Sequence, residues 1–137
     1  MPTPSRKIVV LITGCTEGGI GGALCHEYAE QDAYTVYAAL RNPATLGESL
    51  SAKVDGVVRM DVSDGASVQS AVDGVLEKAG RIDVLINNAG LNAATGAAIE
   101  VDLERYKQTF DVNVGARSVW YSRWRSSPPP SPCSTLA

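Results

Sequence analysis

The chain has 137 residues, 45% of them hydrophobic and 20% charged, with 13 glycines, seven prolines and three cysteines. This is the composition of about one globular domain, and it excludes a collagen, a coiled coil and a wholly disordered chain. Such a domain buries roughly two-thirds of its unfolded surface, so it needs no disulfide or metal to be stable. Cys15, Cys25 and Cys133 show no metal-ligand spacing, which favours a reducing compartment and predicts no metal site.

Charge and hydropathy predict an intracellular, cytoplasmic protein. The net charge of −3 gives no sign of nucleic-acid binding. No apolar run reaches the roughly 18 residues of a membrane span, and residues 1–7 lack the charge-then-apolar order of a signal peptide. Peripheral attachment to a membrane would leave no such trace.

The composition changes after Val114. Residues 115–137 carry three arginines, no acid, both tryptophans and four of the seven prolines. We therefore expect a domain over residues 7–114, flanked by a disordered segment 1–6 and a disordered Arg/Ser/Pro-rich tail 115–137. The tail is either an out-of-frame continuation of the gene or a genuine Pro-rich linker or partner-binding segment.

The first half of the expected domain has the pattern of a strand, a helix and a second strand. Ile8–Ile12 is a continuous apolar run, typical of a strand buried on both faces of a parallel sheet. A glycine-rich turn and a helix from Ile20 to about Gln31 follow it. Thr35–Ala39 is the second predicted strand, and Pro43 prevents it from continuing.

The second half repeats this alternation. Val57–Met60 is the third predicted strand and Ile82–Ile86 the fourth. The helix between them is capped by Ser63 or Asp64 and ended by Gly80. Its apolar positions have helical spacing: Val68, Ala71, Val72, Val75 and Leu76. A last helix is predicted farther along the chain. It carries four apolar residues on one stripe: Leu103, Tyr106, Phe110 and Val114.

Strands that alternate with amphipathic helices predict the α/β class. The expected architecture is a Rossmann-type, doubly wound parallel sheet that is truncated after about four strands. Such a half-sheet leaves one edge and the Leu103 to Val114 stripe without cover. One hypothesis is therefore that the chain is a fragment that does not fold stably.

The glycine-rich loop from Thr13 to Gly22 lies directly between the first strand and the first helix. In that position glycines let the backbone approach a pyrophosphate, and the helix N-terminus offers free N–H groups. A tight turn that needs small residues is the alternative. The spacing departs from the usual dinucleotide fingerprint, because the loop has one extra residue.

Four motifs in order resemble the short-chain dehydrogenase/reductase family. They are Thr-Gly-x-x-x-x-Gly-Ile-Gly at residues 13–21, Asp61-Val62, Asn87-Asn88-Ala89-Gly90 and Asn113-Val114. The resemblance covers residues 7–114, and within the family the loop is most similar to the fungal NADPH-dependent 1-acyldihydroxyacetone-phosphate reductase branch. It implies a reductase of a ketone, such as acyldihydroxyacetone phosphate or another lipid-like substrate, with peripheral association to lipid droplets or endoplasmic reticulum.

The resemblance also implies a nicotinamide dinucleotide as cofactor. The residues expected to hold it are Thr13, Gly14, Cys15, Thr16, Glu17, Gly18, Gly19, Ile20, Gly21, Arg41, Asn42, Asp61, Val62, Asn87, Asn88, Ala89 and Gly90.

The end of the second strand favours NADP(H) over NAD(H). An acid there would bind the ribose hydroxyls of NAD, whereas an arginine accommodates the 2′-phosphate of NADP. No acid occurs over residues 33–43, and Arg41 stands at the strand end, with Asn42 beside it. A solvated surface arginine is the alternative.

Asp61 and Asn87 each have both a cofactor-related and a purely structural interpretation. By resemblance, Asp61 accepts a hydrogen bond from the adenine amino group, and Asn87 has a structural role beside the cofactor, with Ala89 and Gly90 against it. Asp61 could instead stabilise the following helix through its dipole, and Asn87 could belong to an ordinary turn.

Asn113 is the one catalytic residue that the resemblance places in this chain. Its helical spacing with Phe110 and Val114 predicts an amide on a buried stripe, where it would have to be hydrogen-bonded and would fix a neighbouring backbone. By resemblance it is the asparagine of the catalytic tetrad, which helps to hold a water in the proton relay.

The remaining catalytic groups of the family are missing. None of the four lysines follows a tyrosine by four residues, and Tyr121 with Arg125 has the spacing but not the ammonium. The serine is absent as well, so we expect negligible catalysis from this chain alone. A non-catalytic dinucleotide-binding or interaction protein is the alternative. Cys15 and His26 have no acid–base partner at a recognisable spacing and are expected to be loop and helix-surface residues.

Overall fold

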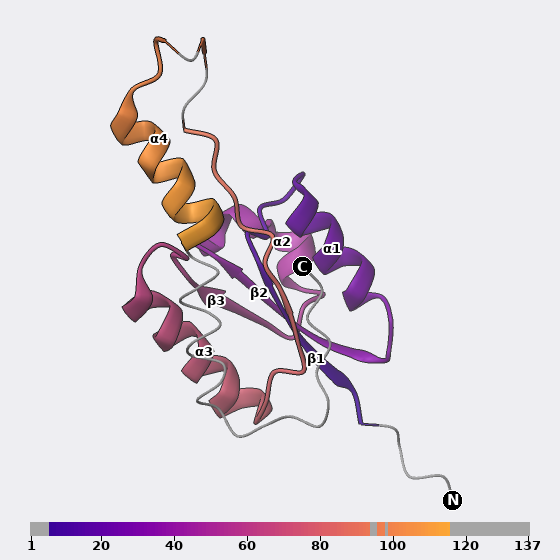
Figure 1. Cartoon of the computed structure of the whole chain (residues 1–137). Coiled ribbons are helices and arrows are strands. Elements are labelled where there is room, and N and C mark those ends of the chain that lie inside the picture. The colour runs from indigo at the N-terminus through magenta and orange to yellow at the C-terminus, as the bar shows by residue number, and fades with distance from the viewer. Residues whose placement is uncertain (1–5, 94–95, 98, 116–137) are drawn as a thin grey trace, which may run out of the picture.

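The computed structural model describes residues 6–93, 96–97 and 99–115 (Figure 1). The predictions for residues 1–5 and for the tail from residue 116 lie outside this range. The elements are β1 (Ile8–Thr13), α1 (Ile20–Ala29), β2 (Tyr34–Leu40), η1 (Pro43–Leu46), α2 (Glu48–Ser51), β3 (Gly56–Arg59), α3 (Gly65–Ala79), β4 (Val84–Ile86), α4 (Leu103–Phe110) and the π-helical turn η2 (Asp111–Gly115).

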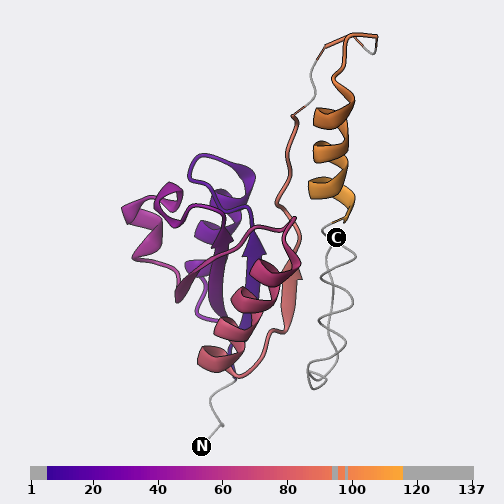
Figure 2. The same ribbon diagram turned by 90° about the vertical axis from the view of Figure 1, so that its left-hand side faces the viewer.

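The four strands form one parallel sheet in the order β3-β2-β1-β4. The chain leaves β1 toward β2 and β3 on one side, then returns through α3 to pair β4 with the other side of β1. Helices cover both faces of the sheet (Figure 2). The predicted fold class, a doubly wound parallel sheet, is thereby confirmed.

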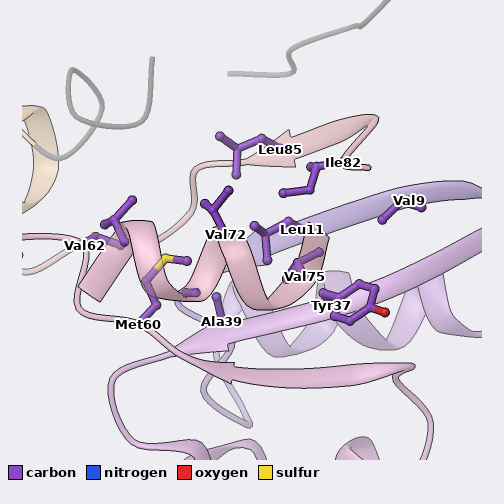
Figure 3. Close-up of a cluster of buried hydrophobic side chains, with 12 residues drawn as sticks. Val9, Leu11, Tyr37, Ala39, Met60, Val62, Val72, Val75, Ile82 and Leu85 are labelled. Carbon is purple, nitrogen blue, oxygen red and sulfur yellow. The ribbon is translucent and has the colours of Figure 1, made fainter. Parts of the chain in front are cut away.

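Successive residues of β1 supply the two hydrophobic cores. Val9 and Leu11 pack with Val68 and Val75 of α3 in what we call the α3-side core (Figure 3). Val10 and Ile12 face the opposite way, and the α1-side core around them has these other members: Cys15, Cys25, Val36, Ala38, Leu40, Leu46, Leu50 and Val54. This alternation explains why β1 is an uninterrupted apolar run.

Helix α3 follows the sequence prediction at both ends. The Asp64 side chain caps it by accepting a hydrogen bond from the Ala66 N–H at 2.9 Å. Gly80 ends it in the left-handed conformation, with φ +75°. Sequence analysis did not predict the short helices η1 and α2, which place Leu46 and Leu50 in the α1-side core.

The predicted last helix exists, but its apolar stripe is not buried. Figures 1 and 2 show α4 standing apart from the sheet. The exposed fractions of Leu103, Tyr106, Phe110 and Val114 are 66%, 54%, 54% and 48%. The prediction of a buried stripe is therefore wrong, whereas the expectation that a half-sheet leaves this stripe uncovered is confirmed for the part of the chain described.

Candidate functional site

A cleft of about 400 Å³ opens at the carboxyl ends of the strands. The loops that follow all four strands contribute residues to it. The cleft lies beside β1, where the strand order changes direction: β2 and β3 lie on one side of β1 and β4 on the other. Such a reversal of strand order is where open α/β sheets bind ligands. The lining residues are Gly14, Thr16, Ile20, Leu40, Arg41, Asn42, Thr45, Met60, Asp61, Val62, Asn88, Ala89, Gly90, Leu91 and Val112.

The glycines of the loop after β1 are required for two different reasons. Gly14 and Gly18 have positive φ angles of 72° and 78°. A Cβ on Gly14 would also lie 2.7 Å from the Ala89 Cα, and one on Gly21 would lie 2.2 Å from the Gly14 carbonyl oxygen. By contrast, a Cβ on Gly18 would meet nothing within 4 Å. Close packing therefore fixes Gly14 and Gly21, whereas Gly18 keeps an open side.

The N-terminus of α1 differs from those of the other long helices. Its cap residue, Gly19, makes no side-chain hydrogen bond to the first turn, which contains no acid. Asp64 and Asp102, in contrast, cap α3 and α4 with their carboxylates. The first N–H groups of α1 thus carry a positive partial charge without a side-chain acceptor, which suits an anion.

A hydrogen-bonded junction joins the ends of β1 and β4. The buried Thr13 hydroxyl accepts from the N–H groups of Asn88 (3.1 Å) and Ala89 (3.0 Å) and donates to the Ile86 carbonyl. The Asn88 side-chain amide donates to the carbonyls of Thr13 and Gly14, both at 3.0 Å. The side-chain amide that joins the ends of β1 and β4 therefore belongs to Asn88. Asn87, for which a structural role was predicted, does not line the cleft.

The loop after β2 is tied to the glycine loop. Asn42 uses its side-chain oxygen to cap η1 by accepting from the Ala44 N–H at 3.2 Å. Thr45 donates its hydroxyl to the Asn42 carbonyl at 2.8 Å, and its own carbonyl accepts from the Glu17 N–H at 2.9 Å. Arg41, which precedes this turn, lines the cleft.

Asp61 follows β3 and lines the cleft together with Arg41, which follows the neighbouring strand β2. Its Oδ1 accepts hydrogen bonds from the Ser63 hydroxyl (2.6 Å) and N–H (3.0 Å). The Ser63 hydroxyl lowers the pKa of Asp61, and the positive charges of Arg41 and Arg59 lower it further. Asp61 is therefore an ionised acceptor near neutral pH.

Asn113 is hydrogen-bonded to a neighbouring backbone, as predicted, although the predicted burial of the residue is wrong. Its Oδ1 accepts from the Leu91 N–H at 2.8 Å, and its Nδ2 donates to the Leu91 carbonyl at 2.9 Å. The residue lies in η2 and is exposed rather than buried.

Cys15 and His26 make no nucleophilic pair. The Cys15 side chain is fully buried and bonds the Ile12 carbonyl at 3.0 Å. Its hydrogen bond with the Cys25 thiol and its burial raise the pKa of Cys15, so it is a neutral thiol. His26 lies on the surface of α1 beside Lys53 and Glu30. The expectation for His26 is thus confirmed, while Cys15 is a core residue with its side chain away from the cleft.

Ten of the predicted cofactor residues line the cleft together. They are Gly14, Thr16, Ile20, Arg41, Asn42, Asp61, Val62, Asn88, Ala89 and Gly90. The others lie in the same loops but outside the lining: Thr13, Cys15, Glu17, Gly18, Gly19, Gly21 and Asn87. Glu17 faces Gly47, where an added Cβ would collide with its carboxylate.

Sequence analysis missed five lining residues: Leu40, Thr45, Met60, Leu91 and Val112. Met60 ends the third predicted strand and Leu40 directly follows the second, so their position could have indicated the site. Thr45 and Val112 come from segments that only the tertiary fold brings to the cleft.

Comparison with known proteins places this geometry in a family. A family model described as short chain dehydrogenase matches residues 8–121. The chain belongs to that family. A short-chain dehydrogenase/reductase of Pestalotiopsis microspora, GME11361, is 35% identical over 113 residues, which are 82% of this chain and 40% of that protein. The 11-beta-hydroxysteroid dehydrogenase A of Sesamum indicum is 36% identical over 110 residues, which are 77% of this chain and 31% of the relative.

Solved structures of this family have a similar fold. A 3-ketoacyl-(acyl-carrier-protein) reductase from Brucella melitensis, complexed with NADH, matches with a TM-score of 0.77 and 27% identity over 88% of this chain and 49% of its own. A variant of actinorhodin polyketide ketoreductase with NADPH matches with a TM-score of 0.78 and 25% identity, over 88% and 47%. The chain thus spans about half the length of these proteins, or less. No helix in the described residues is long and apolar enough to cross a membrane.

Proposed function

We propose that this chain binds NADP(H) across the cleft, as the nucleotide-binding part of a short-chain reductase that acts on a ketone. The observation that carries the proposal is the position of Arg41. It lines the cleft at the end of β2, where a dinucleotide's adenosine ribose is held in this class of fold, and no acid accompanies it over residues 33–43.

The residues present fit a dinucleotide along the whole cleft. The uncapped first turn of α1, whose residue Ile20 lines the cleft, suits the pyrophosphate. Arg41 is placed for the 2′-phosphate, and the ionised Asp61 for the adenine amino group. Asn88, Ala89 and Gly90 then face the nicotinamide half. The cofactor, when bound, supplies the hydride; this chain's residues bind and orient it.

The relatives support a nicotinamide cofactor but leave its choice open, because one structural neighbour is complexed with NADH and another with NADPH. The preference for NADP(H) therefore rests on Arg41. A lipid-like ketone, such as acyldihydroxyacetone phosphate, and a cytoplasmic, lipid-droplet or endoplasmic-reticulum location rest on the resemblance of the glycine loop alone.

A turnover assay tests the expectation that these 137 residues alone do not catalyse the reaction. The 137 residues contain no tyrosine four positions before a lysine, so we expect no measurable oxidation of NADPH by this chain with a panel of ketones. A hydride acceptor needs a proton donor aimed at the developing alkoxide. Turnover that depends on the chain would show that another residue supplies the proton.

Titration with NADPH and NADH tests the assignment of Arg41. We expect NADPH to bind about tenfold or more tightly than NADH, since a charge-assisted bond to phosphate contributes about 1.5–3 kcal/mol. Arg41→Ala should remove this preference by weakening NADPH alone. Arg59→Ala removes an equal charge from the end of β3, outside the cleft lining, and should retain it. Tighter binding of NADH, or a preference unaffected by Arg41→Ala, contradicts the proposal.

A further inference from the structure

An extended segment leaves β4 and runs beside α4 (Figure 2). We call its residues 87–93 the wall, because part of it lines the cleft. Gly90 and Leu91 of this segment line the cleft. Residues 87–93 belong to neither a strand nor a helix. Their backbone groups therefore need partners other than a sheet neighbour.

Two side chains on α4 and η2 supply partners for this backbone. Asn113 holds Leu91 through both its N–H (2.8 Å) and its carbonyl (2.9 Å). Thr109 holds Ala93, because its hydroxyl oxygen accepts from the Ala93 N–H at 3.0 Å. The same hydroxyl donates to the Arg105 carbonyl at 3.0 Å, which fixes the direction of its proton and leaves the oxygen lone pairs for Ala93.

The spacing of these contacts is matched. Thr109 and Asn113 are four residues apart, a rise of about 6 Å along a helix. Leu91 and Ala93 are two residues apart, which is about 6.6 Å along an extended chain. The two segments run in opposite directions, so the two side chains bind alternate residues of the wall. The π-helical turn η2 lies within this contact, and such turns are frequent at functional sites.

Among the described residues, these bonds join α4 and η2 to the wall at Leu91 and Ala93. The apolar stripe of α4 is exposed, and Val112 is the residue of α4 and η2 that packs against the α3-side core. The junction with Thr13 fixes the start of the wall at Asn88 and Ala89, whereas Asn113 and Thr109 hold its continuation at Leu91 and Ala93.

We propose that Thr109 is a positioning residue, which sets the wall at Gly90 and Leu91 for the nicotinamide half of the dinucleotide. The inference rests on the proposed function. With the pyrophosphate over the glycine loop and the adenosine half beside Arg41 and Asp61, the other half reaches the wall after β4. Thr109 touches neither half; it acts through the Ala93 N–H.

The test uses the full chain and two probes, NADPH and adenosine 2′,5′-bisphosphate, which lacks the nicotinamide half. Thr109→Val keeps the shape of the side chain but cannot accept the hydrogen bond. We expect it to weaken NADPH about fivefold or more and to leave the bisphosphate within about twofold. Thr109→Ser retains the hydroxyl and should restore NADPH affinity. Hydrogen exchange at the Ala93 amide should accelerate in the valine variant and recover in the serine variant.

Ala93→Pro removes the same bond from the donor side and should show the same selective loss. In the double variant with Thr109→Val, the two losses should not add, because both remove one interaction. Equal weakening of both probes, or no weakening of NADPH, would overturn the inference. Failure of the proposed function looks different, since the unmodified chain would then bind neither probe.

Discussion

The sheet with α1–α3 and the segment formed by α4 and η2 both contain regularly spaced apolar residues, yet these are used differently. Val10, Leu11 and Ile12 of β1 are fully buried, whereas Leu103 and Phe110 of α4 are more than half exposed. Hydrophobic burial therefore stabilises the sheet, and α4 gains little from it.

Polar contacts hold α4 instead. Asp102 caps its first turn by accepting from the Glu104 N–H at 2.9 Å, and Lys107 pairs with Glu104 at 2.8 Å. Thr109 and Asn113 then fasten it to the wall of the cleft. The side of the cleft at the ends of β1 and β2 is thus supported by a buried apolar core, whereas the side lined by Gly90 and Leu91 is held by hydrogen bonds.

Truncating one leucine in each region should change the free energy of unfolding more than any other substitution considered below. Leu11→Ala opens a cavity in a fully buried site and should lower the free energy of unfolding by about 2–5 kcal/mol. Leu103→Ala removes a side chain that is 66% exposed and should change it by less than about 0.5 kcal/mol. Urea denaturation measures both. Similar losses would mean that α4 is covered in solution.

The next effect lies at the junction of β1 and β4. Thr13→Val removes a buried hydroxyl and leaves the half-buried N–H groups of Asn88 and Ala89 without their acceptor. We expect a loss of about 1–3 kcal/mol in the free energy of unfolding and weaker binding of NADPH. Thr13→Ser keeps the oxygen and should lose less. If valine is tolerated as well as serine, the hydroxyl does not hold the two strand ends together.

The sheet could be predicted from the sequence because its signals are local. The runs at Ile8–Ile12 and Ile82–Ile86 suit strands covered on both faces, and Asp64 with Gly80 delimits α3. The helices η1 and α2 could not, because one-turn helices are set by tertiary contacts such as the burial of Leu46 and Leu50.

The site was predictable where residues directly follow strands. Arg41, Asp61 and Asn88 were found because the carboxyl ends of parallel strands meet at one edge. The burial of Cys15 was missed, since its contact with Cys25 appears only when α1 folds back on the sheet. The stripe of α4 was misjudged for a different reason: helical spacing indicates an apolar face but not whether anything covers it.

A smaller effect of opposite sign tests the helix that packs on the sheet. Gly74 lies within α3, and a Cβ there would meet nothing within 4 Å. Gly74→Ala should therefore raise the free energy of unfolding by about 0.5–1 kcal/mol. Gly80→Ala is the matched control, because Gly80 has equal space but a φ of +75°. The control should lower stability by about 1 kcal/mol. Equal responses would contradict the role of φ.

The smallest effect is the pH dependence contributed by Asp61, which lies where the sheet faces α4. A hollow there is lined by Arg41 and Asp61 together with Glu104, Lys107 and Asp111 of α4 and η2. The Ser63 hydroxyl, with Arg41 and Arg59, lowers the pKa of Asp61 in the folded state. Its stabilisation is therefore complete above the ordinary aspartate pKa of about 3.9 and is lost as the pH falls through the lower, folded value.

Unfolding by urea between about pH 6 and pH 2 measures this contribution. Asp61→Asn should flatten the decline in stability below about pH 4, by less than roughly 1 kcal/mol, because the carboxyl is partly exposed. Ser63→Ala should flatten it partly, since it removes the largest cause of the lowered pKa. If Ser63→Ala leaves the decline as steep as in the unmodified chain, the positive charges of Arg41 and Arg59, rather than Ser63, hold the carboxylate. An unchanged decline in Asp61→Asn would contradict the contribution of Asp61 itself.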